Sequence, residues 1–201
     1  AELFCAAGER HASLSAEEGN PVLAELGRAM AMNNDVADKD GKPAGEPTEL
    51  ALFEAAHQAG FEKAVLEQAS PRTGVIPFDS ERKLMTTLHR VSEAVVAYTK
   101  GAPEQVLARC SRASGIDGLM AFEPEVALAE ATQLADEGYR VLAFAKRELS
   151  RLPEPLQPRT TEQELTFLGL VALIDPPRPE AAQAVADCLT AGITPVMITG
   201  D

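Results

Sequence analysis

The spacing of apolar positions along the chain predicts helices and strands that follow one another in no simple repeat. The first helix follows Asn20-Pro21, an N-cap residue with proline at the first helical position. Two later helices stop at Gly60 and Gly138, glycines that terminate the apolar period. The helices predicted in this part of the chain cover about residues 20–34, 48–59, 102–110 and 123–138.

Runs rich in apolar and β-branched residues predict a group of strands in the middle of the chain. Short polar breaks separate the first three runs, as is typical of antiparallel neighbours. A proline-rich connection over residues 151–160 predicts an exposed loop. The strands are predicted over residues 74–78, 83–90, 94–100 and 139–149. We therefore expect residues 1–160 to form an α+β domain, an antiparallel sheet flanked by helices.

The end of the chain follows a different pattern. Residues 165–175 form a continuous apolar run, which predicts a strand covered on both faces. Residues 176–192 predict a helix with proline entry and glycine exit, and residues 193–199 predict a second short strand. Strand, helix and strand at this spacing indicate a parallel βαβ unit. We expect residues 161–201 to form part of a second, α/β domain.

Composition excludes several classes of protein. The net charge of −13 argues against a nucleic-acid partner, although a local pocket on an acidic chain can still be cationic. The three cysteines, Cys5, Cys110 and Cys188, match no metal-site or disulfide spacing, which favours a reducing compartment. The sequence contains no apolar run long enough to span a bilayer and no signal segment.

One candidate site lies around the middle strands. Phe78 stands beside a charge-rich turn, and Lys100 precedes Gly101 and Ala102 where a strand gives way to a helix. A cation beside a helix N-terminus suits a phosphate or a planar polar ligand. From residue type alone, Phe78 is more often a core aromatic and Lys100 a solvated charge at a strand end.

Other residues allow two interpretations each. Asp175 follows a predicted core strand, where open α/β sheets collect ligands, but it also suits an N-cap for the next helix. Glu49 lies in the first turn of a predicted helix, where it complements the helix dipole. Arg140 opens an otherwise apolar strand as either a snorkelling edge residue or a ligand clamp.

Six motifs taken in order resemble the cytoplasmic headpiece of P-type cation-transporting ATPases, most closely the branch that contains the calcium pumps. They are "GEPTELAL", "FDSERKLM", "KGAPE", "GYRVLAFA", "DPPRPE" and "MITGD", and the resemblance covers about residues 20–201. It implies that residues 1–160 are a nucleotide-binding domain. It also implies that residues 161–201 are a partial phosphorylation domain of the haloacid-dehalogenase type.

The resemblance assigns roles residue by residue. Phe78 would stack on the adenine ring of ATP or ADP, Glu49 would accept from the adenine amino group, and Arg140 would reach the phosphates. The nucleotide-binding residues implied are Glu49, Phe78, Lys83, Met85, Lys100, Gly101, Ala102, Arg140 and Leu142. Some calcium pumps carry an arginine at the position of Ser80. That phosphate contact is either missing here or supplied by Arg82 or Arg140.

A second set of residues would face the phosphates or organise the hinge between the domains. These are Asp175, Arg178, Thr199, Gly200 and Asp201. The family's phosphorylated aspartate, in a DKTGT loop, is not in the sequence, and neither is its Mg²⁺-holding loop. We therefore expect no catalytic residue and no metal ligand in this chain, weak nucleotide binding without hydrolysis, and an exposed, idle Asp201.

The resemblance also implies a parent protein and partners for this chain. The parent would be an integral membrane pump that uses ATP and Mg²⁺, and this chain a soluble, monomeric part on its cytoplasmic side. Its partners would be the actuator domain, the rest of the phosphorylation domain and the membrane helices. Two alternatives remain. A soluble haloacid-dehalogenase-like phosphatase would need its own nucleophilic aspartate loop, and a non-catalytic interaction module would bind a basic partner through the acidic surface.

Overall fold

The computed structural model describes residues 2–5, 10–11, 19–39, 41–174 and 179–196. Its centre is a nine-stranded mixed sheet in the order β2-β1-β11-β10-β7-β6-β5, with β8 added to β11 and β9 to β8. β3 and β4 form a separate hairpin. The strands are β1 (Glu2–Cys5), β2 (Arg10–His11), β3 (Ala37–Lys39), β4 (Lys42–Ala44), β5 (Arg72–Asp79), β6 (Leu84–Val91), β7 (Ala94–Gly101), β8 (Cys110–Gly115), β9 (Gly118–Met120), β10 (Arg140–Leu149) and β11 (Leu165–Leu173).

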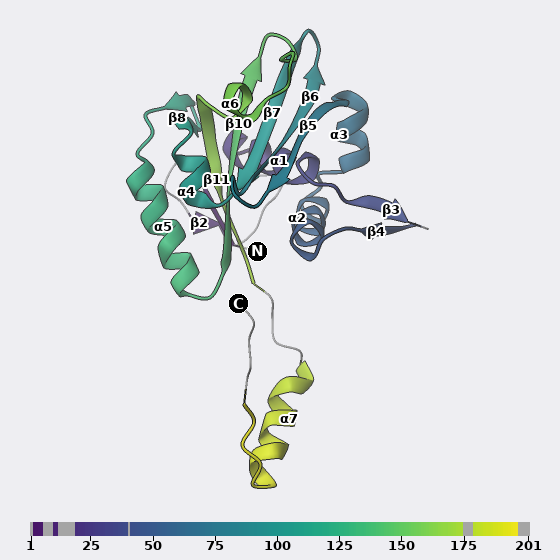
Figure 1. Cartoon of the computed structure of the whole chain (residues 1–201), viewed down its shortest axis with the longest axis vertical. Helices are drawn as coiled ribbons and strands as arrows, with labels where there is room; N and C mark the ends of the chain where they lie inside the picture. The colour runs from purple at the N-terminus through teal and green to yellow at the C-terminus, as the bar shows by residue number, and fades with distance from the viewer. Residues whose placement is uncertain (1, 6–9, 12–18, 40, 175–178, 197–201) are drawn as a thin grey trace.

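Helices cover both faces of this sheet, so each face carries an apolar core. The helices are α1 (Pro21–Met32), α2 (Pro47–Gln58), α3 (Lys63–Ala69), α4 (Pro103–Leu107), α5 (Pro124–Asp136), α6 (Pro158–Thr161) and α7 (Pro179–Thr190). One core joins α1 and α2 to the sheet through residues such as Leu26 and Phe144. The other joins α4 and α5 through residues such as Leu134 and Phe167. Figure 1 shows α5 on one side of the sheet and α2 and α3 on the other. The expectation of an α+β arrangement is confirmed for the described residues up to residue 160.

The start of α1 follows the predicted capping pattern. The Oδ1 atom of Asn20 accepts hydrogen bonds from the backbone N–H groups of Val22 (2.9 Å) and Leu23 (3.3 Å). Two of the N–H groups that lack a helical partner are thereby satisfied. The helix then buries Leu23, Leu26 and Met30 against the sheet.

The strand predicted over residues 165–175 is correct in position but wrong in its partners. β11 is buried on both faces, as its apolar run predicts. It pairs antiparallel with β10 and β1, and parallel only with the short β8. It therefore belongs to the large sheet, and none of its described partners is a strand that follows α7. The continuous apolar run reports burial, whereas the direction of the neighbouring strands depends on distant residues.

The rest of the predicted βαβ unit is described only in part. The predicted helix is present as α7, residues 193–196 form no strand, and residues 197–201 lie outside the described residues. The haloacid-dehalogenase-like unit is therefore still an expectation. The division of the chain between residues 160 and 161 also stays a prediction, because strand pairing does not test which parts fold independently.

Several elements differ from the sequence pattern. The helix predicted over residues 102–110 ends at Leu107, and β8 begins at Cys110. The proline-rich connection contains α6, and its Leu152 and Leu156 pack against a small apolar cluster instead of lying fully exposed. Helix α3 and the short strands β1 to β4, β8 and β9 were not predicted. Each is too short for a clear apolar period.

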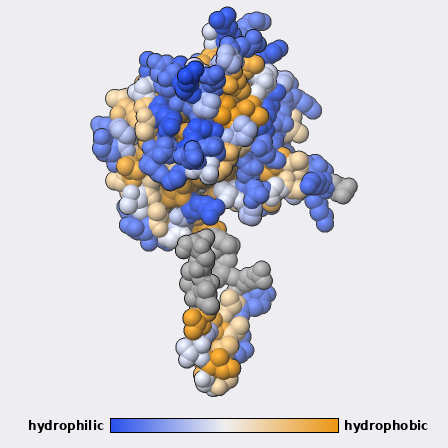
Figure 2. Space-filling model, viewed as in Figure 1, coloured by the Kyte–Doolittle hydropathy of each residue, from blue (hydrophilic) through white to orange (hydrophobic). Residues whose placement is uncertain are grey.

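The apolar side chains of α7 and the residues after it are exposed. Figure 2 shows apolar surface over this helix, while the face of the sheet domain in the same view is mainly hydrophilic. The exposed side chains are Val185, Leu189, Ile193 and Val196. Among the described residues, no helix has the length and apolar character needed to cross a membrane.

The buried His89 on β6 predicts that stability depends on pH. It is fully buried, and burial, together with the nearby positive charges of Arg72 and Lys63, lowers its pKa from 6.5 to about 4. Between these values the unfolded chain binds a proton that the folded chain does not. Stability is therefore full above pH 6.5 and falls as the pH drops to 4, by up to about 3 kcal/mol from this residue.

Urea unfolding at several pH values, with an NMR titration of the His89 ring, checks this prediction. The His89→Gln variant should lose much of the pH dependence between pH 6.5 and 4, whereas His57→Gln, at an exposed position, should keep it. A His89 ring that titrates near 6.5 in the folded protein would contradict the prediction.

Candidate functional site

The nucleotide-site residues implied by the sequence come together in one pocket. It has a volume of about 680 Å³, within the range of small-molecule sites. The pocket contains every residue of that predicted set except Lys83 and Ala102. Its lining residues are Asp35, Gly45, Glu46, Thr48, Glu49, Phe78, Met85, Lys100, Gly101, Arg140 and Leu142.

The floor of the pocket is built by three neighbouring strands. Met85 on β6 lies directly opposite Lys100 on β7, and Lys100 lies opposite Phe144 on β10. Leu142 precedes Phe144 by two residues, so it lies on the same face of the sheet. Period-two alternation therefore places Met85, Lys100 and Leu142 side by side, although they are far apart in the sequence.

Lys100 and Glu49 form an ion pair at the base of the pocket. The Nζ atom of Lys100 lies 2.7 Å from Glu49 Oε1 and donates a second hydrogen bond to the Asn33 carbonyl at 2.5 Å. Their side chains are only 8% and 15% exposed. Burial lowers the pKa of Lys100, and the hydrogen bond and charge of Glu49 oppose that shift.

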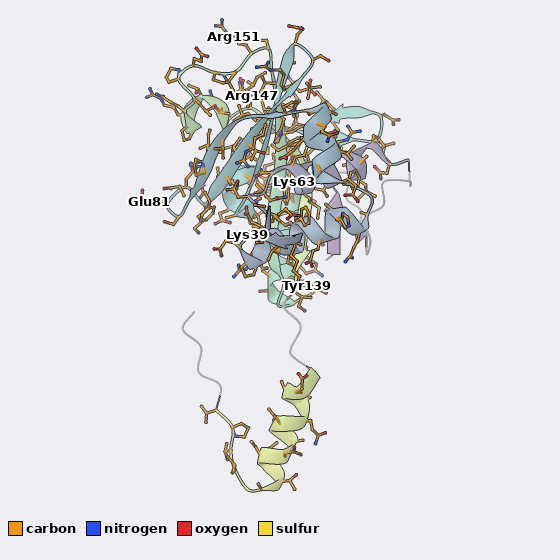
Figure 3. The ribbon with its side chains drawn as sticks, turned by 90° about the vertical axis from the view of Figure 1, so that its right-hand side faces the viewer. Lys39, Lys63, Glu81, Tyr139, Arg147 and Arg151 are labelled. Atoms are coloured by element: carbon orange, nitrogen blue, oxygen red, sulfur yellow. The ribbon has the colours of Figure 1, made fainter. Side chains whose placement is uncertain are left out.

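The second carboxylate oxygen of Glu49 is also held. Glu49 Oε2 accepts a hydrogen bond from the backbone N–H of Asp35 at 3.0 Å. The turn that supplies this N–H is fixed from outside by two cations. Lys63, labelled in Figure 3, donates to the Asn34 side chain at 2.8 Å and to the Val36 carbonyl at 2.9 Å. Arg72 pairs with the Asp35 carboxylate at 2.8 Å. The base of the pocket is therefore a fixed arrangement of backbone and charge.

Phe78 lies at an irregularity of β5. Ile76 pairs with Thr86 and Asp79 with Leu84, so Pro77 and Phe78 together face the single residue Met85. Two residues opposite one is a β-bulge, which re-aims a side chain. Phe78 lines the pocket and is 62% exposed, so the interpretation of Phe78 as a core aromatic is wrong.

Gly101 permits a close approach of two backbones. A Cβ atom at this position would collide with the Lys83 carbonyl and the Leu84 side chain. Ala102, the next residue, donates its N–H to that same carbonyl at 3.1 Å. Lys83 itself lies in the turn after β5 and forms an exposed ion pair with Glu104 at 3.3 Å. Lys83 and Ala102 thus flank the pocket without lining it.

Two arginines were candidates for a phosphate contact, and their surroundings differ. Arg140 is exposed at the pocket and donates a hydrogen bond to Thr48 Oγ1 at 3.0 Å. Arg82 instead bonds to Glu162 and to the carbonyls of Pro77 and Leu84. Arg140 is therefore the arginine available to a ligand.

Some site residues were missed, and others cannot be placed. Asp35, Gly45, Glu46 and Thr48 line the pocket without having been predicted. The last three belong to the quoted motif "GEPTELAL", which was the available signal, while Asp35 lies in a loop with no pattern. The hinge set of Asp175, Arg178, Thr199, Gly200 and Asp201 lies outside the described residues.

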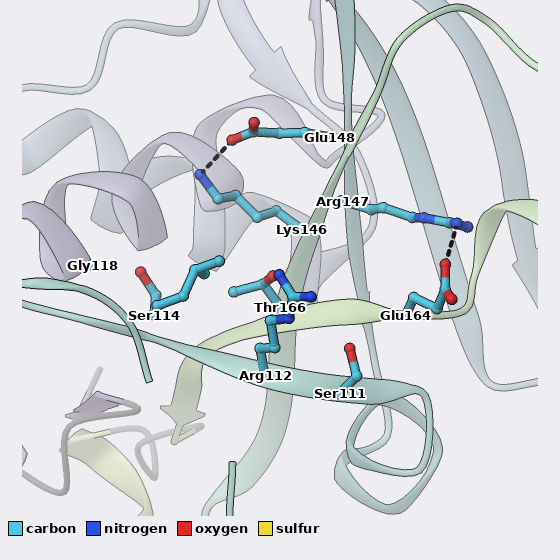
Figure 4. Close-up of a pocket in the computed structure, with 10 residues that line it drawn as sticks. Ser111, Arg112, Ser114, Gly118, Lys146, Arg147, Glu148, Glu164 and Thr166 are labelled. Carbon is cyan, nitrogen blue, oxygen red and sulfur yellow. Dashed lines mark hydrogen bonds and ion pairs between the residues drawn. The ribbon is translucent and has the colours of Figure 1, made fainter. Parts of the chain in front are cut away.

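A second hollow, of about 720 Å³, is lined mainly by polar and charged side chains from β8 to β11. Figure 4 shows that two of its cations are already paired, Lys146 with Glu148 at 3.3 Å and Arg147 with Glu164 at 2.7 Å. It offers no exposed aromatic, unlike the pocket at Phe78. Among the described residues, no cluster of three or more His, Cys, Asp or Glu side chains could hold a metal ion.

Comparison with known proteins identifies the family of the chain. Residues 22–180 match the model of the P-type ATPase cytoplasmic domain N. The chain belongs to the P-type ATPase family. The chain is 36% identical over 185 residues to calcium-transporting ATPase 1 of Bacillus cereus, covering 90% of this chain and 21% of that protein.

Two further relatives are also named as cation-transporting ATPases. The chain is 40% identical over 186 residues to the cation-transporting ATPase pma1 of Synechocystis, covering 90% of this chain and 20% of that protein. It is 39% identical over 178 residues to the probable cation-transporting ATPase F of Mycobacterium bovis, covering 86% of this chain and 20% of that protein. The chain thus spans about a fifth of the length of these relatives.

The Lys100–Glu49 pair should be strongly coupled. Lys100→Met alone leaves a partly buried carboxylate without its cation, and Glu49→Gln alone leaves a buried ammonium without its anion. We expect each single change to lower the free energy of unfolding by about 2 kcal/mol or more. The double variant should cost clearly less than the sum, as measured by urea unfolding in a double-mutant cycle.

The exposed pair of Lys83 and Glu104 is the matched control, since those side chains are 54% and 47% exposed. The cycle of Lys83→Met and Glu104→Gln should give a coupling of less than about 1 kcal/mol. Equal coupling in the two cycles would show that the pair in the pocket is no more than a surface contact.

Proposed function

We propose that this chain is the nucleotide-binding domain of a cation-transporting P-type ATPase and holds ATP by its adenosine half in the pocket at Phe78. The observation that carries the proposal is the exposed Phe78 ring beside an apolar floor of Met85 and Leu142, with the Lys100–Glu49 pair at the base. A planar base can stack on an exposed aromatic ring without any hydrogen bond that identifies the base. The polar groups at the base would then set the orientation of the base.

The residues fit the two ends of the nucleotide. Glu49 offers carboxylate oxygens, which are acceptors for an exocyclic amino group, and its position is fixed by Lys100 and the Asp35 N–H. At the pocket rim, Arg140 provides a guanidinium group suited to phosphate oxygens. Arg82 is committed to backbone carbonyls and to Glu162, so Arg140 fulfils the phosphate role left open by Ser80. Lys83 and Ala102 would assist from the flank.

The proposal extends to the whole protein of which this domain is part. There, ATP held here would be presented for phosphorylation of an aspartate on a loop absent from this chain, with Mg²⁺ accompanying the phosphates. The domain would lie on the cytoplasmic side, next to the actuator domain, the phosphorylation domain and the membrane helices. The transported ion would be a cation, and calcium is proposed because the Bacillus cereus relative is named for it. The hinge roles of Asp175, Arg178, Thr199, Gly200 and Asp201 belong to this proposal.

An NMR titration of the chain with adenosine, ADP and ATP tests the site. The amides of Phe78, Lys100 and Glu49 should shift with all three ligands, because all three carry adenine. Phe78→Leu should weaken binding about fivefold or more, since stacking on a base contributes about 1–3 kcal/mol. The chain alone should not hydrolyse ATP.

Phe53→Leu is the control, because Phe53 stacks on His57 along α2 and does not line the pocket. It should bind adenosine as the unaltered chain does. If the amides of Phe78, Lys100 and Glu49 do not move at millimolar ATP, or if Phe78→Leu binds normally, the nucleotide site is wrong.

A further inference from the structure

The β-bulge that aims Phe78 is held by an arginine from the same turn. Pro77 and Phe78 lie opposite one residue of β6, so the Pro77 carbonyl is displaced from the regular ladder. Arg82 Nη2 donates to this carbonyl at 2.6 Å. Its Nη1 donates to the Leu84 carbonyl, on the other strand of the hairpin, at 2.9 Å. One planar guanidinium group therefore bridges both sides of the turn.

Arg82 is held in turn by a carboxylate from a distant part of the sequence. Glu162, which follows α6, accepts from Arg82 Nη1 at 2.7 Å through its Oε1 atom. The two side chains are 15% and 1% exposed. A carboxylate this deeply buried is retained only where its charge is compensated, and Arg82 is the cation in contact with it.

Glu162 lies behind the pocket and not in it. Its Oε1 also accepts from Thr86 Oγ1 at 2.7 Å, and Thr86 lies 2.9 Å from Thr99 through their hydroxyls. Thr86 and Thr99 directly follow and precede Met85 and Lys100, whose side chains line the pocket on the opposite face of the sheet. The carboxylate therefore fixes both the turn that carries Phe78 and the strands beneath the floor.

We infer that Glu162 is a positioning residue of the nucleotide site: it holds Arg82 on the Pro77 carbonyl, and this contact sets the bulge that presents Phe78 to the adenine. The inference rests on the proposed function and adds a residue that touches no ligand. No side chain packs Phe78 into a core, since the ring is 62% exposed, so its direction depends on the backbone of the bulge.

Glu162→Gln tests the inference, because it keeps the shape of the side chain and removes its charge. Affinities for adenosine and for ATP are measured by calorimetry on the whole chain, with and without Phe78→Leu. Glu162→Gln should weaken both ligands by the same factor, about fivefold, because the effect passes through the stacked base. In the Phe78→Leu background it should have no further effect.

Glu164→Gln is the matched control: Glu164 lies two residues away, its side chain is 73% exposed and pairs with Arg147, and the change should leave both affinities unchanged. Arg82→Lys is the second variant if Glu162→Gln does not fold. It keeps the charge but cannot bridge Pro77 and Glu162 together, so it should reproduce the same pattern. Circular dichroism and the amide spectrum show whether each variant is folded.

The outcomes separate the inference from the function on which it rests. Normal affinity in Glu162→Gln, an equal loss with and without Phe78, or a loss for ATP but not for adenosine would each overturn the positioning role. If the unaltered chain does not bind adenosine, or Phe78→Leu does not weaken it, the proposed nucleotide site itself fails.

Discussion

The buried ion pair between Lys100 and Glu49 is the interaction on which the pocket depends. It joins β7 to the first turn of α2, two elements that α3, β5 and β6 separate in the sequence. A buried pair is favourable only when its remaining hydrogen-bonding groups are satisfied. Here the Asn33 carbonyl and the Asp35 N–H provide those contacts, so the turn after α1 must also be ordered. Lys63 and Arg72 order it, which makes the base of the pocket rigid.

A second buried ion pair lies on the other face of the same strands. Arg82 and Glu162 connect the β5–β6 turn to the segment that enters β11. The hydroxyls of Thr86 and Thr99 add a cross-strand link beside it. The strands β6 and β7 therefore carry the pocket on one face and its support on the other. Substrate-binding geometry of this kind needs such support, because small displacements of a positioned group cost affinity.

Much of the fold could be predicted from local patterns, but its connections could not. The N-cap at Asn20 and the β5–β7 strands follow directly from residue type and spacing. The burial of β11 was also predictable, whereas its antiparallel partners were not, because an apolar run carries no directional information. In the site, motif order predicted Phe78, Lys100 and Glu49 together. It did not predict that Arg82 is committed to Glu162, since that contact joins residues eighty positions apart.

The exposure of Phe78 is the most informative departure from ordinary packing. An aromatic ring left 62% exposed retains hydrophobic free energy that a flat ligand can recover by covering it, at about 25 cal/mol per Å². The ring lies in the bulge of an edge strand, where no further described strand of the sheet competes for that surface. Its orientation consequently comes from hydrogen bonds to the backbone and not from packing of the ring. This explains why the polar network behind the sheet, rather than an apolar core, accompanies the aromatic residue of this site.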